Sequence, residues 1–388
     1  MKIVKIGEPK IIMSNPTSRH NYFAWPTIAR LKNGRIAVAA SGFRLSHACP
    51  FGKTVMSFSD DEAETYTLPM PVIDTFMDDR DGGLTPFGES SVCITSINDP
   101  VDFYRQHTNT YPWSKYAEEY LDTISQEESD NYLGSLFRIS HDNGVTFGPI
   151  GRCPVSSPHG PVALPDGTLL WLGKMHQGDE HGIRAYKIDP RDESVTCLCE
   201  IEGTNTSYDE TFYDEPHVVL LDDGTLLAHI RIQKRGVGKY DIFSICQSES
   251  YDYGKTWTQP RLILDPVAGA PAHLYKTSSG MLISARGYRI KPTFGVKVMF
   301  SKDNGKTWTD DQFLYENTFN ADLGYPTTVE LKDGTFLTVF YAAPEQGKPP
   351  VVMQQKWRLE DGDAEQERPF AETADDTNEA SNIQHTLL

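Results

Sequence analysis

The stretch Thr327–Tyr341, TTVELKDGTFLTVFY, consists of two apolar runs joined by a short turn that contains Gly334. Glycine adopts the left-handed backbone conformation of such turns without steric cost, and runs rich in β-branched and aromatic residues are typical of strands. The stretch therefore predicts a β-hairpin.

This hairpin pattern recurs along the 388 residues. Similar stretches occur at 27–40, 162–173, 218–231 and 273–286, with a weaker copy at 82–97. The turn glycines are separated by 54, 79, 57, 56 and 54 residues, and they are Gly34, Gly88, Gly167, Gly224, Gly280 and Gly334. A repeat of about 55 residues that holds a hairpin is the signature of a four-stranded propeller blade. We predict an all-β, six-bladed β-propeller over residues 1–358, with four-stranded antiparallel blades.

The two ends of this region are expected to meet. The segment 2–12, KIVKIGEPKII, precedes the first hairpin and has no partner in the first blade. The last blade ends near 351–359, VVMQQKWRL. We expect the first segment to pair with the last blade and to close the ring as an outer strand.

A second motif, S-x-D-x-G-x-T-aromatic, occurs at 301–308, 250–257 and 140–147, with a degenerate copy at 59–66 that has Ala63 in place of glycine. The aspartate can accept local backbone N–H bonds, and the glycine supplies a positive φ. Because one catalyst cannot occur four times, we interpret these Asp boxes as scaffolding. The third blade has no recognisable box.

The spacing of 79 residues indicates an insertion at about 98–130 in the second blade. Its stretch 111–126, YPWSKYAEEYLDTISQ, has helical periodicity and several aromatic side chains. Antiparallel alternation places this connection on the face of the wheel opposite the Asp boxes. We expect a helical lid or subsite wall, the alternative being a decorative surface insertion.

Composition excludes some classes of partner. The net charge is −18, and the segment 360–388 contributes about −8 of it. An acidic surface without a basic stripe disfavours nucleic acid. No apolar run reaches membrane-spanning length, and the N-terminus lacks the apolar core of a signal peptide, so we expect a cytoplasmic protein without a membrane partner. The acidic tail, 359–388, is expected to be disordered.

The cysteines and histidines do not form a metal-ligand motif. The six cysteines are scattered without a CxxC pair, which favours reduced thiols. Cys49 is interpreted as a packed thiol. Three histidines, His159, His217 and His273, follow the blade repeat and not a ligand spacing. We therefore expect neither a metal nor another cofactor.

The starts of the inner strands should line the central channel, and they are unusually polar. Counting back from each turn glycine gives Trp25, Asp79, Arg80, Asp81, His159, Glu215, His217, His273 and Tyr325. The connections after the second strands add Arg44, His47, Arg231, Arg286 and Arg289. This set predicts a polar, partly cationic substrate pocket.

On these motifs the chain resembles the sialidase superfamily, six-bladed propellers with Asp-box (BNR) repeats that include exo-α-sialidases. Sialidases use a Tyr nucleophile activated by Glu, an Asp acid/base and three arginines that hold the substrate carboxylate. The segment 324–341, GYPTTVELKDGTFLTVFY, resembles the start of the last blade of that family and implies Tyr325 as nucleophile. The segment 214–231, DEPHVVLLDDGTLLAHIR, implies Glu215 as its partner and Arg231 as a carboxylate ligand.

The chain departs from the family at three places. Ala24 stands where the first blade of the family has an arginine, and the loop after Arg44, LSHACPFGK, contains no acidic residue. The stretch 293–301, TFGVKVMFS, has no arginine at the approach to the Asp box of the fifth blade. Arg286 or Arg289 can compensate for a missing arginine. Asp81 or Asp79 can supply the acid, with Asp81 favoured because Arg80 stands beside it, and His47 is the rival proton donor.

The leading hypothesis is a glycoside hydrolase that releases a terminal acidic sugar by a retaining mechanism. Its catalytic residues would be Tyr325, Glu215 and either Asp81 or His47. Its substrate-binding residues would be Trp25, Arg44, Arg80, His159, His217, Arg231, His273, Arg286 and Arg289. The alternatives are a propeller glycosidase or lyase on a uronate or rhamnose-type linkage with a histidine acid/base, and a carbohydrate-binding propeller without catalysis. The sequence does not define the oligomeric state.

Overall fold

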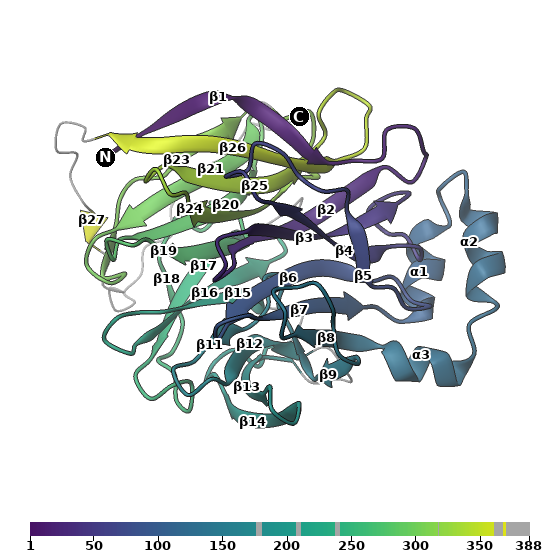
Figure 1. Cartoon of the computed structure of the whole chain (residues 1–388), viewed down its shortest axis with the longest axis horizontal. Helices are drawn as coiled ribbons and strands as arrows, with labels where there is room; N and C mark the ends of the chain where they lie inside the picture. The colour runs from purple at the N-terminus through teal and green to yellow at the C-terminus, as the bar shows by residue number, and fades with distance from the viewer. Residues whose placement is uncertain (176–180, 207–210, 237–240, 317, 361–367, 370–388) are drawn as a thin grey trace.

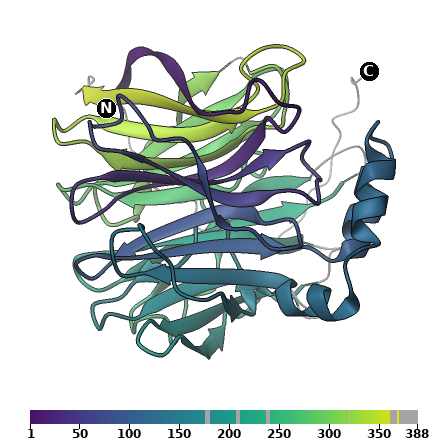
Figure 2. The ribbon, with the colours of Figure 1, turned by 45° about the vertical axis from the view of Figure 1, so that its right-hand side comes forward.

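Six antiparallel sheets form a β-propeller, as the repeat predicted. The structure is a computed structural model that describes residues 1–175, 181–206, 211–236, 241–316, 318–360 and 368–369. Figures 1 and 2 show the blades side by side, with the helices gathered beyond one end of the strands.

The blades follow one another in chain order, and each runs from an inner to an outer strand. The first holds β2 (Tyr22–Arg30), β3 (Ile36–Arg44), β4 (Lys53–Ser59) and β5 (Met70–Ile73), and the second β6 (Arg80–Phe87), β7 (Ser91–Asn98), β8 (Gly134–Ser140) and β9 (Gly151–Cys153). The third holds β10 (Val155–Ser156), β11 (Val162–Ala163), β12 (Leu169–Met175), β13 (Ile183–Asp189) and β14 (Ser194–Glu200). The fourth holds β15 (Thr211–Leu220), β16 (Leu226–Lys234), β17 (Ile242–Ser250) and β18 (Arg261–Leu262).

The fifth blade holds β19 (Ala272–Lys276), β20 (Leu282–Arg289), β21 (Phe294–Ser301) and β23 (Gln312–Glu316). The sixth holds β24 (Gly324–Glu330), β25 (Phe336–Ala342) and β26 (Val351–Glu360), and its outer strand is β1 (Lys2–Met13). β1 pairs with β26 in antiparallel register from Lys2 opposite Glu360 to Met13 opposite Val352. The expected closure of the ring by the first strand is confirmed.

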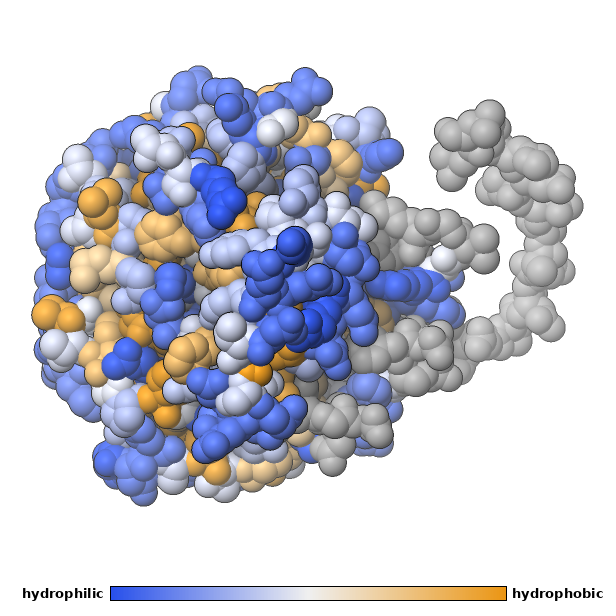
Figure 3. All heavy atoms as spheres, turned by 90° about the vertical axis from the view of Figure 1, so that its right-hand side faces the viewer, coloured by the Kyte–Doolittle hydropathy of each residue, from blue (hydrophilic) through white to orange (hydrophobic). Residues whose placement is uncertain are grey.

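The insertion in the second blade is helical, as predicted. It connects β7 to β8 through α1 (Val101–Thr108), α2 (Ser114–Leu121) and α3 (Gln126–Tyr132). α3 begins with a capping box, in which the Ser125 side chain and Glu128 each bind the backbone N–H of the other. The helical insertion packs against the first blade, where the ring of Tyr116 stacks on that of Phe51 with centroids 4.9 Å apart. The face that carries them is largely hydrophilic, with scattered apolar residues (Figure 3).

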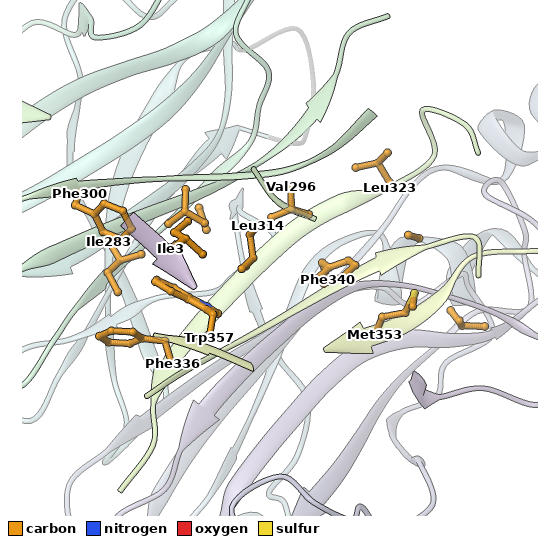
Figure 4. Close-up of a cluster of buried hydrophobic side chains, with 14 residues drawn as sticks. Ile3, Ile283, Val296, Phe300, Leu314, Leu323, Phe336, Phe340, Met353 and Trp357 are labelled. Carbon is orange, nitrogen blue, oxygen red and sulfur yellow. The ribbon is translucent and has the colours of Figure 1, made fainter. Parts of the chain in front are cut away.

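The described residues form eight buried hydrophobic clusters, and the six largest lie one between each pair of neighbouring blades. Figure 4 shows the cluster between the fifth and sixth blades, where Trp357 packs near Phe300 and Phe336. Ile3 of β1 joins this cluster, so the closing strand is held by apolar contact as well as by backbone pairing.

The Asp boxes are turns between the third and fourth strands. Asp303 accepts hydrogen bonds from the backbone N–H of Thr307 at 2.9 Å and from its hydroxyl at 2.7 Å, and Ser301 caps Gly305. Asp61, Asp142 and Asp252 make the same contacts to Thr65, Thr146 and Thr256. Both oxygens of each carboxylate accept hydrogen bonds inside the turn, which agrees with the scaffolding interpretation.

Most of the acidic tail lies outside the described residues, and the prediction of disorder there is untested. Its described part, β27 (Arg368–Pro369), pairs with β22 (Thr307–Trp308) beside the last Asp box. No helix among the described residues is long and apolar enough to span a membrane.

The cluster between the fifth and sixth blades gives a stability prediction. Trp357 is fully buried, and its indole N–H donates to the Thr338 hydroxyl at 2.9 Å. Replacing it with alanine leaves a cavity and should lower the free energy of unfolding by about 3–5 kcal/mol. Urea denaturation followed by fluorescence and circular dichroism measures this change.

The control is Leu68→Ala, because Leu68 is 84% exposed and should change the free energy of unfolding by less than about 0.5 kcal/mol. Equal denaturation midpoints for the two variants would show that the fold does not depend on this cluster.

Candidate active site

The inner strands of four blades share an uncommon backbone conformation at their channel ends. Trp25, Asp81, Glu215 and Tyr325 have φ values of 53°, 51°, 45° and 48°. In each case a bulge interrupts the pairing with the second strand. A bulge re-aims a side chain, and left-handed backbone at a non-glycine residue is often found at functional sites. The bulges bring these four residues to equivalent places around the channel.

The structure corrects one alignment made from the sequence. Counting nine residues back from the turn glycine puts Asp79 in the same place as Glu215 and Tyr325. The bulge instead puts Asp81 there, because the first hairpin of the second blade is two residues shorter. Asp79 is buried and accepts hydrogen bonds from the backbone and hydroxyl of Thr75 at 2.7 and 3.0 Å. Its carboxylate is therefore already hydrogen-bonded within the loop that precedes β6.

Tyr325 and Glu215, 110 positions apart, are in direct contact. The phenol of Tyr325 donates a hydrogen bond to Oε1 of Glu215, and Nη1 of Arg231 donates to Oε2 at 2.6 Å. Burial and the negative charge of Glu215 raise the pKa of Tyr325 well above its usual value. Burial alone would lower the pKa of Arg231, but Glu215 raises it. The site thus holds a neutral phenol against a carboxylate that is neutralised by an arginine.

Asp81 is a partly buried acid that interacts electrostatically with this pair. Burial raises its pKa to about 7, against the opposing effect of Arg80, and the charge of Glu215 adds to the rise. The guanidinium of Arg80 lies 4.5 Å from the ring centroid of Trp25 and 3.8 Å from Asp99. Asp81 can therefore carry a proton at neutral pH in the same channel as the phenol.

Two residues that the sequence assigned to substrate binding are packed inside the protein. Arg44 has a fully buried side chain that donates to both oxygens of Asp78 and to the carbonyls of Ser46 and His47. Trp25 is 1% exposed, because Arg44 and Arg80 cover its ring. Their contacts hold the 45–50 loop and support the channel wall, and they leave no free surface for a ligand.

His47 is half exposed and belongs to a second polar group. Its Nδ1 lies 3.1 Å from Oδ1 of Asp322, and the hydroxyls of Tyr22 and Tyr341 also donate to this carboxylate. Burial would raise the pKa of Asp322, but the hydrogen bonds from His47 and Tyr22 lower it below the usual value. The His47 ring lies 5.1 Å from Trp25, so this group adjoins the Tyr325 site.

The three channel histidines form one cluster, in which His217 and His273 are stacked and His159 meets both rings edge-on. The rings of His217 and His273 are 4.2 Å apart, and His159 lies 5.5 and 5.2 Å from them. Burial lowers the pKa of His217 to about 3 and lowers those of His159 and His273 well below the usual value. The histidines are neutral at pH 7 and act only as uncharged donors or acceptors. Across the described part of the chain, no group of three His, Cys, Asp or Glu side chains could hold a metal ion.

The two arginines of β20 have different surroundings. Arg289 lies over the ring of Tyr325, with its guanidinium carbon 5.3 Å from the centroid, and donates to the carbonyl of Leu323. Arg286 is 1% exposed and binds Asp311 and the carbonyl of Ala268. Residues three apart on a strand point to opposite faces. Arg286 is thus outside the site, in contrast to the sequence assignment.

Tyr22, Asp322, Tyr341 and Gln233 belong to the site, and the sequence analysis missed them. Gln233 accepts a hydrogen bond from Arg231. Tyr22 and Asp322 are 300 positions apart and meet only because the first and last blades are neighbours. The available signal was their nearness in sequence to the predicted residues, since Tyr22 precedes Trp25 and Asp322 precedes Tyr325 by three positions.

Comparisons with solved structures show how widely this propeller occurs. A protein of unknown function from Dyadobacter fermentans superposes with a TM-score of 0.70 at 18% identity, over 92% of this chain and 99% of the other. The intramolecular trans-sialidase of Ruminococcus gnavus, in complex with oseltamivir carboxylate, gives 0.61 at 12% identity, over 90% and 97%. The α-L-arabinanase of Penicillium chrysogenum, complexed with arabinobiose, gives 0.60 at 14% identity, over 92% and 98%.

At these identities the likeness establishes the fold alone, which is the six-bladed β-propeller. A search of curated protein sequences gave no match. The family model described as the BNR repeat-like domain matches residues 123–338, which is more than half of the chain. The chain therefore belongs to the BNR repeat-like domain family.

Proposed function

We propose that the protein is a retaining glycoside hydrolase that releases a terminal acidic sugar, as an exo-α-sialidase does. The observation that carries the proposal is the hydrogen bond from the Tyr325 phenol to Glu215. A phenol is a poor nucleophile until a nearby base takes its proton. The carboxylate is already in place to receive it.

The proposed reaction has two steps. In the first, the Tyr325 oxygen attacks the anomeric carbon while its proton passes to Glu215, and the leaving group takes a proton from Asp81. In the second, water attacks the same carbon, Asp81 recovers a proton from the water, and Glu215 returns its proton to the departing phenolate. Two displacements on opposite faces retain the configuration. A pKa of about 7 suits Asp81 for donating in one step and accepting in the other.

The charge around the pair supports an acidic substrate. Arg231 and Arg289 both lie at Tyr325 and Glu215, and a carboxylated sugar placed there would meet guanidinium groups. Ala24 leaves the first blade without the arginine of sialidases, so Arg231 and Arg289 would bind the carboxylate without that third partner.

A second candidate rests on His47. His47 and Asp322 line a cavity of about 610 Å³, and the half-exposed ring is accessible to a substrate proton. A glycosidase or lyase on a uronate or rhamnose-type linkage would use His47 as its acid/base. In that case His47→Ala abolishes turnover, while Tyr325→Phe lowers it only mildly.

The first test is Tyr325→Phe, which removes only the nucleophilic oxygen. On a fluorogenic sialoside we expect kcat/KM to fall at least about 100-fold, since the covalent step is lost. Steady-state kinetics measures the fall, and Tyr251→Phe is the matched control because Tyr251 is an exposed Asp-box residue.

The mechanism is wrong if the wild-type chain hydrolyses the sialoside and Tyr325→Phe lowers kcat/KM only slightly. Turnover confined to uronate or rhamnosyl glycans, lost on His47→Ala, favours the second candidate. Glycan binding without turnover of any substrate indicates a non-catalytic binding propeller.

The protonation of Asp81 can be tested without activity. The folded chain keeps this proton up to about pH 7, whereas the unfolded chain releases it near pH 4. Asp81 therefore makes the free energy of unfolding fall as the pH rises from about 4 to 7, by up to about 4 kcal/mol. In Asp81→Asn this part of the pH dependence should disappear, as measured by denaturation at several pH values.

Glu89→Gln is the control, because Glu89 is an exposed residue of the same blade. It should keep the wild-type pH dependence. An Asp81→Asn variant with the full wild-type slope would mean that Asp81 is already ionised at pH 5 and is not the proton donor.

A further inference from the structure

A cavity of about 610 Å³ opens beside the Tyr325 site, where the first and last blades meet. Its walls come from four segments around the junction of these blades, 16–22, 45–47, 322 and 347–349, with one side chain from the helical insertion. It is lined by Pro16, Ser18, Arg19, Asn21, Tyr22, Leu45, Ser46, His47, Tyr111, Asp322, Gly347, Lys348 and Pro349. A volume of this size accommodates a ligand of one or two sugar units.

The floor of the cavity is continuous with the proposed catalytic cluster. Tyr22, His47 and Asp322 line it and are hydrogen-bonded to one another. Tyr341, which also binds Asp322, has its ring 6.0 Å from that of Tyr325. The floor of the cavity is therefore linked to the Tyr325 site through Tyr341, and the unit that leaves on cleavage has room beside that site.

The charge of the cavity is opposite to that of the protein. The single carboxylate in its lining, Asp322, accepts hydrogen bonds from Tyr22 and Tyr341 and contacts His47. Arg19 and Lys348 are exposed at the rim, and within the described residues neither takes part in an ion pair. In a chain of net charge −18, this leaves two uncompensated cations above a satisfied carboxylate.

An aromatic wall completes the cavity. Tyr111 lies in the segment between α1 and α2, and its ring stacks on Trp113 with centroids 4.9 Å apart and planes inclined by 6°. The guanidinium of Arg19 lies 5.4 Å from the ring centroid of Tyr116 in α2. The helical insertion thus holds one wall and helps to place the cation.

We propose that this cavity is the leaving-group subsite and that it takes an anionic sugar, carboxylated or sulfated, held by Arg19 and Lys348. The preferred substrate is then a glycan with acidic units on both sides of the cleaved bond. The assignment of the cavity to the leaving group rests on the proposed function, because only a cleaved substrate has one. Binding of the anionic unit does not depend on catalysis.

The experiment compares two substrates on the full chain. One carries a second sialic acid on the leaving side, as in an α2,8-linked disialoside, and the other is neutral there, as in 3′-sialyllactose. The double variant Arg19→Gln/Lys348→Gln should lower the ratio of the two kcat/KM values about tenfold, because two attractive charges are lost. Raising the salt from 0.05 to 0.5 M should reduce the wild-type ratio in the same direction.

The matched control is Lys32→Gln/Lys255→Gln, which removes two exposed cations that lie outside the cavity lining, one in the β2–β3 turn and one in an Asp-box turn. It should leave the ratio unchanged. The subsite is wrong if both substrates are hydrolysed and the ratio of the two kcat/KM values falls equally in the two double variants. It is also wrong if the ratio falls in neither of them.

Calorimetry on Tyr325→Phe separates this inference from the proposed function. If no substrate is hydrolysed by the wild-type chain but the disialoside binds more tightly than sialyllactose, and Arg19→Gln/Lys348→Gln removes the difference, the subsite is supported and the hydrolase is not. If the disialoside binds no better than sialyllactose, the subsite is wrong whatever the activity.

Discussion

Closure of the ring is the constraint on which the site depends. β1 and β26 come from opposite ends of the propeller and pair over most of their length, and Ile3 joins the cluster around Trp357. Apolar clusters between all neighbouring blades then fix how far each blade is rotated about the axis. Only in the closed ring do the inner strands of the fourth and sixth blades place Glu215 and Tyr325 in contact.

The channel residues are held at a cost in backbone energy. A left-handed conformation at a non-glycine residue costs about 1–2 kcal/mol, and Trp25, Asp81, Glu215 and Tyr325 all adopt it. The bulged strands would lose this strain if they continued in regular pairing. They are kept in place by contacts within and between blades. The ion pair of Glu215 with Arg231 lies within the fourth blade, and the ring of Trp25 packs against Arg44 of its own blade and Arg80 of the second. Strain that surrounding contacts maintain is a feature of preorganised sites.

The burial and the partners of each arginine decide its role. Arg44 and Arg286 are buried with Asp78 and Asp311, and each also binds backbone carbonyls. A buried guanidinium must be paired, because an unpaired charge in the interior is very costly. These two arginines therefore support loops, while Arg231 and Arg289 remain at the Tyr325–Glu215 pair. Four arginines that all lie on the second strands of their blades therefore have two distinct kinds of surroundings.

The sequence by itself determined the number of blades, the Asp-box turns, the place of the helical insertion and the outer position of the first strand. These features depend on the spacing of the repeats and on local turn chemistry, both of which can be read directly along the chain. The tertiary structure decided that Asp81 and not Asp79 faces the channel, that Arg286 does not, and that Tyr22 and Asp322 share a hydrogen bond with His47. A bulge shifts every side chain after it, and contacts across 300 positions exist only when the ring is closed; neither leaves a local pattern in the chain.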